Sequence, residues 1–278
     1  MKTKDIDFVP KRQLGQNFLI DPNILRKIVA ACDLKTTDTI LEIGPGLGVL
    51  TNALSQHVKK IFAVETDHKL CQNLIEQFKD SNVTIIHADF LKYCLDALPS
   101  HLKVVGNLPY YISTPIIEKI LNYRKKFTVM YITLQWELGL RMTAQVGSRD
   151  YSALSCYLQY YTDAKILFKI KNTCFRPIPK VDSCFMELMI RSEPLYKINH
   201  EELLFKLIHS AFQQRRKTIV NALDTLVDRR EMIKILEMLQ IDCKLRAENL
   251  SLRNYVELTE TIEQFKKGER LTRFIRED

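Results

Sequence analysis

The sequence lacks the marks of an exported or membrane-embedded protein. No apolar run approaches the length of a membrane-spanning helix, and the opening segment Met1–Asp7 contains no apolar core of a signal peptide. The seven cysteines are scattered and form no C-x-x-C pair, which argues against a zinc site and a disulfide framework. Repeats and low-complexity tracts are missing too. We therefore expect a cytoplasmic protein with free thiols, no metal and no membrane partner.

Acidic residues are outnumbered in this chain of 278 residues. It has 41 Lys and Arg against 33 Asp and Glu, which gives a formal net charge of +8. Such a balance favours a polyanionic partner such as nucleic acid. The length allows one large domain and one small domain.

Seven apolar segments alternate with helical patterns along the chain. The expected strands are Thr39–Ile43, Lys60–Val64, Val83–His87, Leu102–Gly106, Thr128–Leu134, Ala164–Ile170 and Cys184–Ile190. This alternation predicts an α/β fold with a mainly parallel, doubly wound, seven-stranded sheet, whose ligand sites lie beyond the carboxyl ends of the strands. The strand pattern stops around residues 192–194. Beyond them, apolar positions recur at helical spacing, with Asn199 as the expected N-cap of the first helix. We expect two domains, residues 1–193 and a small all-helical domain over residues 194–278.

Glycines and acids follow the first three predicted strands. A glycine-rich turn, residues 44–48, comes after the first strand and opens a helix, which lets the backbone approach a ligand closely. Glu65 ends the second strand, where its carboxylate can accept hydrogen bonds from both hydroxyls of a ribose. Asp89 follows the third strand and can accept a hydrogen bond from an adenine amino group. Dinucleotide enzymes share the glycines and the ribose acid but use G-x-G-x-x-G spacing, and a third-strand acid followed by a fourth-strand Asn-x-Pro-Tyr favours S-adenosylmethionine as the cofactor. Solvated strand ends are the alternative interpretation of Glu65 and Asp89.

The fourth predicted strand runs into Asn107-Leu108-Pro109-Tyr110. The Asn amide oxygen and a backbone carbonyl held by the following proline can accept hydrogen bonds from an exocyclic amine, while the tyrosine ring stacks on the base. An adenine N6 is a poor nucleophile, because its lone pair is delocalised into the ring. Two acceptors aimed at its hydrogens favour charge build-up on the nitrogen as it attacks a methyl group. Taken alone, the segment is equally explained by a turn with core tyrosines.

Phe175 heads a further candidate segment, Phe-x-Pro-x-Pro. Pro177 and Pro179 stiffen this loop and reduce the entropy of holding an aromatic ring in place. Enzymes that act on a base usually take it out of the stack and sandwich it between rings. A core phenylalanine ahead of a proline loop is the alternative interpretation.

Taken together, these residues resemble the KsgA-type ribosomal RNA small-subunit adenine dimethyltransferases along nearly the whole chain. The matching segments are Gln16–Leu19, Glu42–Gly48, Asn107–Ser113, Phe175–Ser183 and Phe212–Lys217. The resemblance implies a class I, Rossmann-like methyltransferase fold that uses S-adenosyl-L-methionine. It also implies that two adjacent adenosines near the 3′ end of 16S rRNA become N6,N6-dimethyladenosine during ribosome biogenesis, on an immature small subunit. We expect the enzyme to be a monomer.

The resemblance also implies a set of cofactor-binding residues: Asn17, Leu19, Gly44, Gly46, Glu65, Asp89 and Asn107. Asn17 and Leu19 would close over the cofactor, and Gly44 would line its methionine part. Glu65 would hold the ribose hydroxyls and Asp89 the adenine, as the residues themselves indicate.

The implied catalytic residues are Asn107, Leu108, Tyr110 and Phe175. Asn107 and the carbonyl of Leu108 would orient the target amine. Tyr110 would lie on one face of the target base and Phe175 on the other.

A cationic cluster, Arg215, Arg216 and Lys217, is expected at the end of the first helix of the second domain. Basic residues late in a helix complement its dipole, which is the simpler explanation. Three adjacent cations exceed what a dipole needs, so we expect these residues to bind RNA phosphates.

Three other functions compete with this interpretation. An adenine methyltransferase of the antibiotic-resistance type, acting on large-subunit rRNA, shares the glycine and Asn-x-Pro-Tyr motifs. The segments Phe175–Ser183 and Phe212–Lys217 favour the small-subunit enzyme over it. A DNA adenine methyltransferase would need a further base-reading domain, for which the length leaves no room. A ribosome-assembly factor is compatible with the enzyme role.

Overall fold

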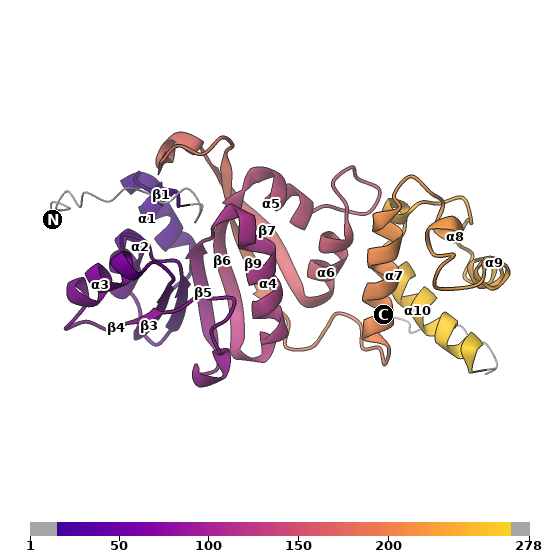
Figure 1. Ribbon diagram of the computed structural model, residues 1–278, viewed down its shortest axis with the longest axis horizontal. Coiled ribbons are helices and arrows are strands. Elements are labelled where there is room, and N and C mark those ends of the chain that lie inside the picture. The colour runs from indigo at the N-terminus through magenta and orange to yellow at the C-terminus, as the bar shows by residue number, and fades with distance from the viewer. Residues whose placement is uncertain (1–15, 268–278) are drawn as a thin grey trace. The chain divides into compact units, whose positions relative to one another are not determined.

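The computed structural model describes residues 16–267, and the chain divides into two compact units (Figure 1). The first unit extends to Gly139 and resumes over Ala164–Ser192. The second contains Leu140–Asp163 and the chain from Glu193 onward. Within the described part of the chain, no helix is both long and apolar enough to cross a membrane.

The first unit is built on a seven-stranded sheet with the order β4-β3-β2-β5-β6-β9-β7. Its strands are β2 (Thr39–Ile43), β3 (Lys60–Glu65), β4 (Val83–His87), β5 (Leu102–Asn107), β6 (Phe127–Gln135), β7 (Thr162–Ile170) and β9 (Ser183–Ile190). The neighbours from β4 to β6 are parallel, and β9 runs antiparallel to β6. Each strand lies within two residues of its predicted bounds, so the predicted α/β fold is confirmed.

Helices connect these strands. They are α1 (Pro22–Ala31), α2 (Val49–Ser55), α3 (His68–Gln77), α4 (Ser113–Asn122) and α5 (Trp136–Met142). In Figure 1, α4 crosses in front of the sheet. Neighbours along a strand point to opposite faces, yet Ile40 and Leu41 of β2 are both 0% exposed. Both faces of the sheet are therefore covered, which explains why the central strands are almost continuously apolar.

The strand register brings the ligand-binding ends together. Ile43 pairs with Val64 on one side and with Gly106 on the other, and Val64 pairs in turn with Ile86. The segments that follow β2, β3, β4 and β5 therefore emerge side by side at one edge of the sheet.

A separate two-stranded sheet joins β1 (Phe18–Leu19) to β8 (Phe175–Arg176), with Leu19 opposite Phe175. The main-chain N–H of Ile20 extends this pairing by donating to the carbonyl of Cys174 over 2.9 Å. Strands of two residues carry no periodicity, so they were not predictable from the sequence. The pairing places the start of the described chain beside the proline loop.

The second unit is helical. Its helices are α6 (Ala153–Tyr161), α7 (Glu201–Gln213), α8 (Ile219–Ala222), α9 (Arg229–Met238) and α10 (Leu252–Lys266). Helix α7 begins after His200, without a side-chain cap, so the predicted N-cap at Asn199 is wrong. Glu201 and Glu202 lie in its first turn, where negative charge complements the helix dipole and stabilises this end instead.

Residues 140–163 group with the helical unit, whereas the sequence placed them in the first domain. Aromatic packing accounts for this. The rings of Tyr157 and Tyr160 lie 5.2 and 5.3 Å from the ring of Phe205 on α7. The hydroxyls of Tyr160 and Tyr161 both donate to the carboxylate of Glu201.

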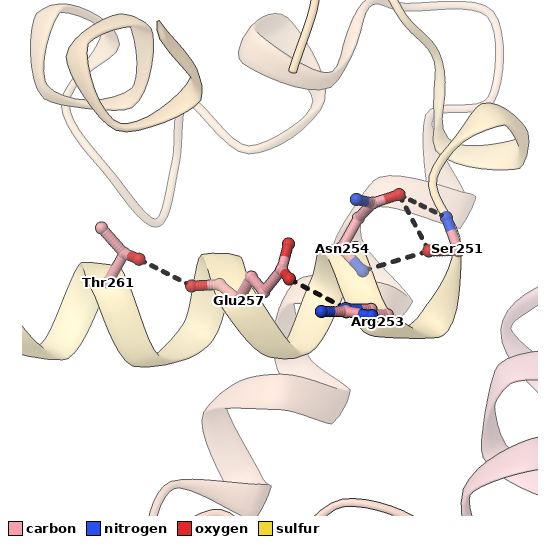
Figure 2. A network of polar contacts seen from close by, with 5 residues as sticks. All are labelled: Ser251, Arg253, Asn254, Glu257 and Thr261. Atoms are coloured by element: carbon pink, nitrogen blue, oxygen red, sulfur yellow. Dashed lines mark hydrogen bonds and ion pairs between the residues drawn. The ribbon is translucent and has the colours of Figure 1, made fainter. Parts of the chain in front are cut away.

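The start of α10 is a capping box (Figure 2). The main-chain N–H and the hydroxyl of Ser251 both donate to Oδ1 of Asn254, whose own N–H donates back to the Ser251 hydroxyl over 3.2 Å. Further along, Arg253 pairs with Glu257 at 3.1 Å, and the Thr261 hydroxyl donates to the carbonyl of Glu257. These local contacts stabilise the helix that closes the described chain.

Candidate active site

A cavity of about 340 Å³ opens at the edge of the sheet where β2, β3, β4 and β5 end. Its volume suits a cofactor-sized ligand. The predicted residues that line it are Asn17, Leu19, Gly44, Gly46, Leu108, Glu65, Asp89, Asn107, Tyr110 and Phe175. All of them belong to the first unit. The structure thus brings together residues that are far apart in the sequence.

The glycine turn has a backbone that other residues adopt with difficulty. Gly44, Gly46 and Gly48 have φ angles of +69°, +59° and +74°. A Cβ built on Gly46 would lie 2.8 Å from Cε1 of Phe18. Both the conformation and the close approach of the Phe18 ring therefore require glycine at position 46. Phe18 belongs to the matching segment Gln16–Leu19 but was assigned no role, because a single apolar side chain there carries no distinguishing pattern.

Glu65 joins the turn to the end of β3. It is 5% exposed, and its two carboxylate oxygens accept hydrogen bonds from the main-chain N–H groups of Gly46 (3.1 Å) and Asp67 (2.9 Å). Burial raises the pKa of Glu65, and these hydrogen bonds oppose that shift. A carboxylate has about four lone-pair sites, so the oxygens keep capacity for ligand hydroxyls.

Glu42 is a second buried acid at the cavity, and sequence reasoning assigned it no role of its own. It is 1% exposed, and its Oε2 has no hydrogen-bond partner among the described residues. Burial raises the pKa of Glu42 to about 8, with Thr51 opposing the shift and the charge of Glu65 adding to it. The signal that could have identified it is an acid inside the apolar strand that leads into the glycine turn.

Asp89 lies in the loop after β4. Its Oδ1 accepts a hydrogen bond from the main-chain N–H of Leu91 over 2.9 Å, and its carbonyl accepts from Lys92 and Tyr93. The side chain is exposed and lines the cavity. The loop therefore folds around its own aspartate and presents the carboxylate at the cavity.

Asn107 is the last residue of β5, and its Nδ2 donates to the carbonyl of Asn17 over 2.8 Å. This bond uses one of the two N–H donors of the amide and fixes its orientation, and the amide oxygen can accept a hydrogen bond from a ligand. The next peptide is held as well, because the N–H of Leu108 donates to the carbonyl of Thr133 over 3.1 Å. The Ser113 hydroxyl donates to the carbonyl of Pro109 over 3.0 Å and ties the segment to α4.

The aromatic residues of the cavity differ in exposure. The Tyr110 hydroxyl lies 2.6 Å from that of Ser183, which holds the ring, and burial raises the pKa of Tyr110. Phe175 lines the cavity but is 1% exposed, with its ring among the core residues. In this conformation neither face of the Phe175 ring is exposed to a ligand. The position agrees with the alternative interpretation of Phe175 as a core residue ahead of a proline loop. Tyr111, which the sequence did not single out, is 59% exposed at the same cavity.

The predicted RNA-binding cluster lies in the second unit, in the turns that follow α7 rather than in the helix itself. Arg215 donates to the carbonyl of Arg149 over 3.1 Å, and its Nε lies 3.8 Å from a carboxylate oxygen of Glu248. Arg216 and Lys217 are exposed. Arg215 therefore holds the local structure, whereas the other two cations face solvent.

Comparisons with known proteins decide the family. The chain matches the family "Ribosomal RNA adenine dimethylase" over residues 8–264. It is 38% identical to "Ribosomal RNA small subunit methyltransferase A" of Moorella thermoacetica, covering 92% of this chain and 93% of that protein. It is 39% identical to the protein of the same name from Staphylococcus aureus strain MRSA252, covering 92% and 90%.

The chain belongs to the ribosomal RNA adenine dimethylase family. It is therefore an S-adenosylmethionine-dependent rRNA adenine dimethyltransferase, as the resemblance of its motifs implied.

Solved structures support the fold of this dimethylase. A dimethyladenosine transferase from Plasmodium falciparum superposes with a TM-score of 0.77 at 26% identity, covering 90% of this chain and 98% of that one. The 23S rRNA methyltransferase ErmE superposes with a TM-score of 0.71 at 25% identity, covering 89% and 100%. A 23S rRNA methyltransferase therefore shares this architecture, so the fold alone does not distinguish the small-subunit enzyme from the large-subunit alternative considered above.

The cavity of the dimethylase fits the cofactor that the family uses. Glu42 offers an unpaired buried oxygen and Glu65 a carboxylate with remaining acceptor capacity, and both line the same cavity. S-adenosylmethionine carries an ammonium group and two ribose hydroxyls, which are donors for such acceptors. No group of three or more side chains able to hold a metal ion occurs among residues 16–267.

Proposed function

We propose that this enzyme dimethylates N6 of two adjacent adenosines near the 3′ end of 16S rRNA, in the immature small subunit. The names of its relatives from Moorella and Staphylococcus support the choice of subunit. The observation that carries the chemistry is the hydrogen bond from Asn107 Nδ2 to the Asn17 carbonyl, because it orients an amide whose oxygen can act as an acceptor at the cavity. Such an acceptor is what a target amine needs.

The cofactor supplies an electrophilic methyl group on a sulfonium when it is bound. Asn17 and Leu19 close over it, and the turn at Gly44 and Gly46 approaches its methionine part. Glu65 accepts hydrogen bonds from the ribose hydroxyls. These assignments rest on the position of each residue at one cavity and on the orientation of Glu65 by two main-chain donors. Asp89 binds the adenine, from the loop after β4.

The target adenine meets Asn107 and the carbonyl of Leu108. Both accept hydrogen bonds from the N6 amine and draw its lone pair out of the ring, so that charge develops on nitrogen during attack. Tyr110, held through its hydroxyl at 2.6 Å from Ser183, covers one face of the base. Phe175 lines the same cavity and is assigned to the other face of the base. The proton released by the amine passes to water.

The second unit binds RNA through Arg216 and Lys217, with Arg215 holding the turn that presents them. The enzyme acts as a monomer in the cytoplasm, where it also serves small-subunit assembly.

The test of the substrate is transfer of labelled methyl groups to unmethylated small and large ribosomal subunits, followed by nucleoside mass spectrometry. Dimethyladenosine in small-subunit RNA alone is the expected result. Label in the large-subunit RNA would assign the enzyme to the class of ErmE instead.

The test of the site is Asn107→Ala. Losing one oriented acceptor lowers the transfer rate by about a hundredfold to a thousandfold, by analogy with removal of one oxyanion-hole group. Binding to immature subunits is retained, which separates catalysis from assembly. Asn82→Ala is the matched control, since the Asn82 amide donates to the carbonyls of Ser55 and Val58, outside the cavity. A normal rate in Asn107→Ala would refute the catalytic assignment.

A further inference from the structure

Lys119 lies on α4, the helix that follows residues 107–110 (the target-amine segment), and its ammonium group caps the loop after β4. Its Nζ donates to the carbonyl oxygens of Phe90 (2.8 Å), Leu91 (2.9 Å) and Tyr93 (2.6 Å). An ammonium group has three donors, so this set satisfies all of them. Three charge-assisted hydrogen bonds from one side chain hold a loop far more firmly than its main chain alone would.

The capped loop is the one that carries Asp89. The Asp89 carboxylate accepts from the N–H of Leu91, and the carbonyl of Leu91 accepts from Lys119. Asp89, Phe90 and Leu91 all line the cavity, whereas Lys119 does not. Phe90 is 5% exposed, and the Lys119 ammonium lies 5.4 Å from the centre of its ring. The lysine therefore contacts the back of a loop whose other side faces the cavity.

The environment of Lys119 fits a fixed rather than a solvated cation. Burial lowers the pKa of Lys119, and the charges of Asp89 and Cys94 oppose that shift. The same helix is tied to the target-amine segment by the bond from Ser113 to the Pro109 carbonyl. Helix α4 thus contacts both the loop that carries Asp89 and the target-amine segment.

We infer that Lys119 is a positioning residue for the cofactor, which sets the Asp89 loop against the cavity from the helix that also carries the target-amine segment. This inference rests on the proposed role of Asp89 toward the adenine. It assigns to Lys119 no contact with cofactor or RNA. Its effect is on cofactor affinity, through the adenine end, and not on the methyl-transfer step.

Lys126 provides a matched control. Its Nζ also caps carbonyl groups of the connection between β4 and β5, those of Asp96 (3.0 Å) and Leu98 (2.8 Å). Neither of these residues lines the cavity. Lys126→Met therefore removes the same kind of contact from the same connection without touching the Asp89 loop.

The experiment measures binding of S-adenosylmethionine and of 5′-methylthioadenosine by calorimetry for the full-length wild type, Lys119→Met and Lys126→Met. Methylthioadenosine has the adenine and ribose but no amino-acid part. We expect Lys119→Met to raise the Kd of both ligands by about ten- to a hundredfold, the loss that accompanies removal of charge-assisted hydrogen bonds. The kcat at saturating cofactor stays within about threefold of wild type, since Asn107 and Leu108 are untouched. Lys119→Arg, which keeps the charge and donors, restores part of the affinity.

Several results would overturn the inference: an unchanged Kd in Lys119→Met, an equal loss in Lys126→Met, or a loss for S-adenosylmethionine alone. A Tm drop in Lys119→Met that exceeds that of Lys126→Met, with normal affinity, would make Lys119 a purely structural residue. If Lys119→Met does not fold, Lys119→Gln and Lys119→Arg are compared in its place. Asp89→Asn tests the underlying assumption separately, because wild-type affinity there would refute the role of Asp89 itself.

Discussion

Glu42 and Glu65 are two buried acids that face one cavity with different hydrogen bonding. Glu65 receives two main-chain N–H groups, whereas Oε2 of Glu42 receives none from the described residues. A buried acid holds its proton more tightly than an exposed one, and a neighbouring negative charge adds to this. The pKa of Glu42 at about 8 reflects both effects.

Glu42→Gln is expected to change how the stability of the cofactor-free enzyme depends on pH. Below the ordinary pKa of 4.5 the Glu42 carboxyl is protonated in both the folded and the unfolded protein, so it does not make stability depend on pH. From there to about pH 8 the unfolded chain releases the proton that the folded chain keeps, so the wild type loses stability as pH rises. The slope for this one group is at most about 1.4 kcal/mol per pH unit. Urea unfolding of both proteins across this range measures it, and parallel curves would contradict the buried, protonated state of Glu42.

The glycine turn and β1 act together at the level of elements. The turn needs positive φ angles to pass from β2 into α2, and Gly46 needs its missing side chain because the ring of Phe18 occupies that space. Phe18 is held there by the pairing of β1 with β8. A segment far away in the sequence thus limits which residue the turn accepts.

Gly46→Ala is expected to destabilise the enzyme and weaken cofactor binding. The left-handed backbone alone costs about 1–2 kcal/mol in a residue with a side chain, and the contact with Phe18 adds to this cost. Gly147→Ala is the control, because Gly147 has a φ of +81° but no atom within 4 Å of its built Cβ. Thermal unfolding and calorimetry with S-adenosylmethionine compare the two variants. Equal destabilisation of Gly46→Ala and Gly147→Ala, with normal cofactor binding, would show that the Phe18 ring can move aside without destabilising the protein.

At the scale of the whole molecule, chemistry and RNA contact are assigned to separate units. The cavity is built entirely by the first unit, whereas Arg216 and Lys217 belong to the second. The formal net charge of +8 supports attraction to RNA by the molecule as a whole. A test of Arg216 and Lys217 must therefore separate their own contacts with RNA from the attraction due to the net charge.

The double variant Arg216→Glu, Lys217→Glu is expected to weaken binding to small-subunit RNA and to flatten its salt dependence. Each lost phosphate contact removes about 0.7 to 0.9 from the slope of log affinity against log salt concentration. Lys59→Glu with Lys79→Glu makes the same change in net charge at exposed positions of the first unit and is the control. Arg215 is left intact, because its contacts with Arg149 and Glu248 would confuse the result. If the two double variants show the same slope of log affinity against log salt concentration, Arg216 and Lys217 make no specific contact with RNA phosphates.

The sequence by itself determined the sheet, the presence of a helical second part and many of the residues that line the cavity. Periodicity marks a buried strand because both of its faces are covered, and polar residues at strand ends meet because parallel strands share one edge. Asn107, Glu65 and Asp89 were identifiable for that reason. The assignment of residues 140–163 to the helical unit was not, since it depends on rings of α6 packing against Phe205 of α7.

Only the tertiary structure decided what each side chain contacts. The pairing of β1 with β8, the burial of the Phe175 ring and the unpaired oxygen of Glu42 arise between segments distant in the chain. The capping of the Asp89 loop by Lys119 arises in the same way. Local pattern reports how a segment folds, whereas burial, pKa and hydrogen-bond partners depend on which other segments pack against it.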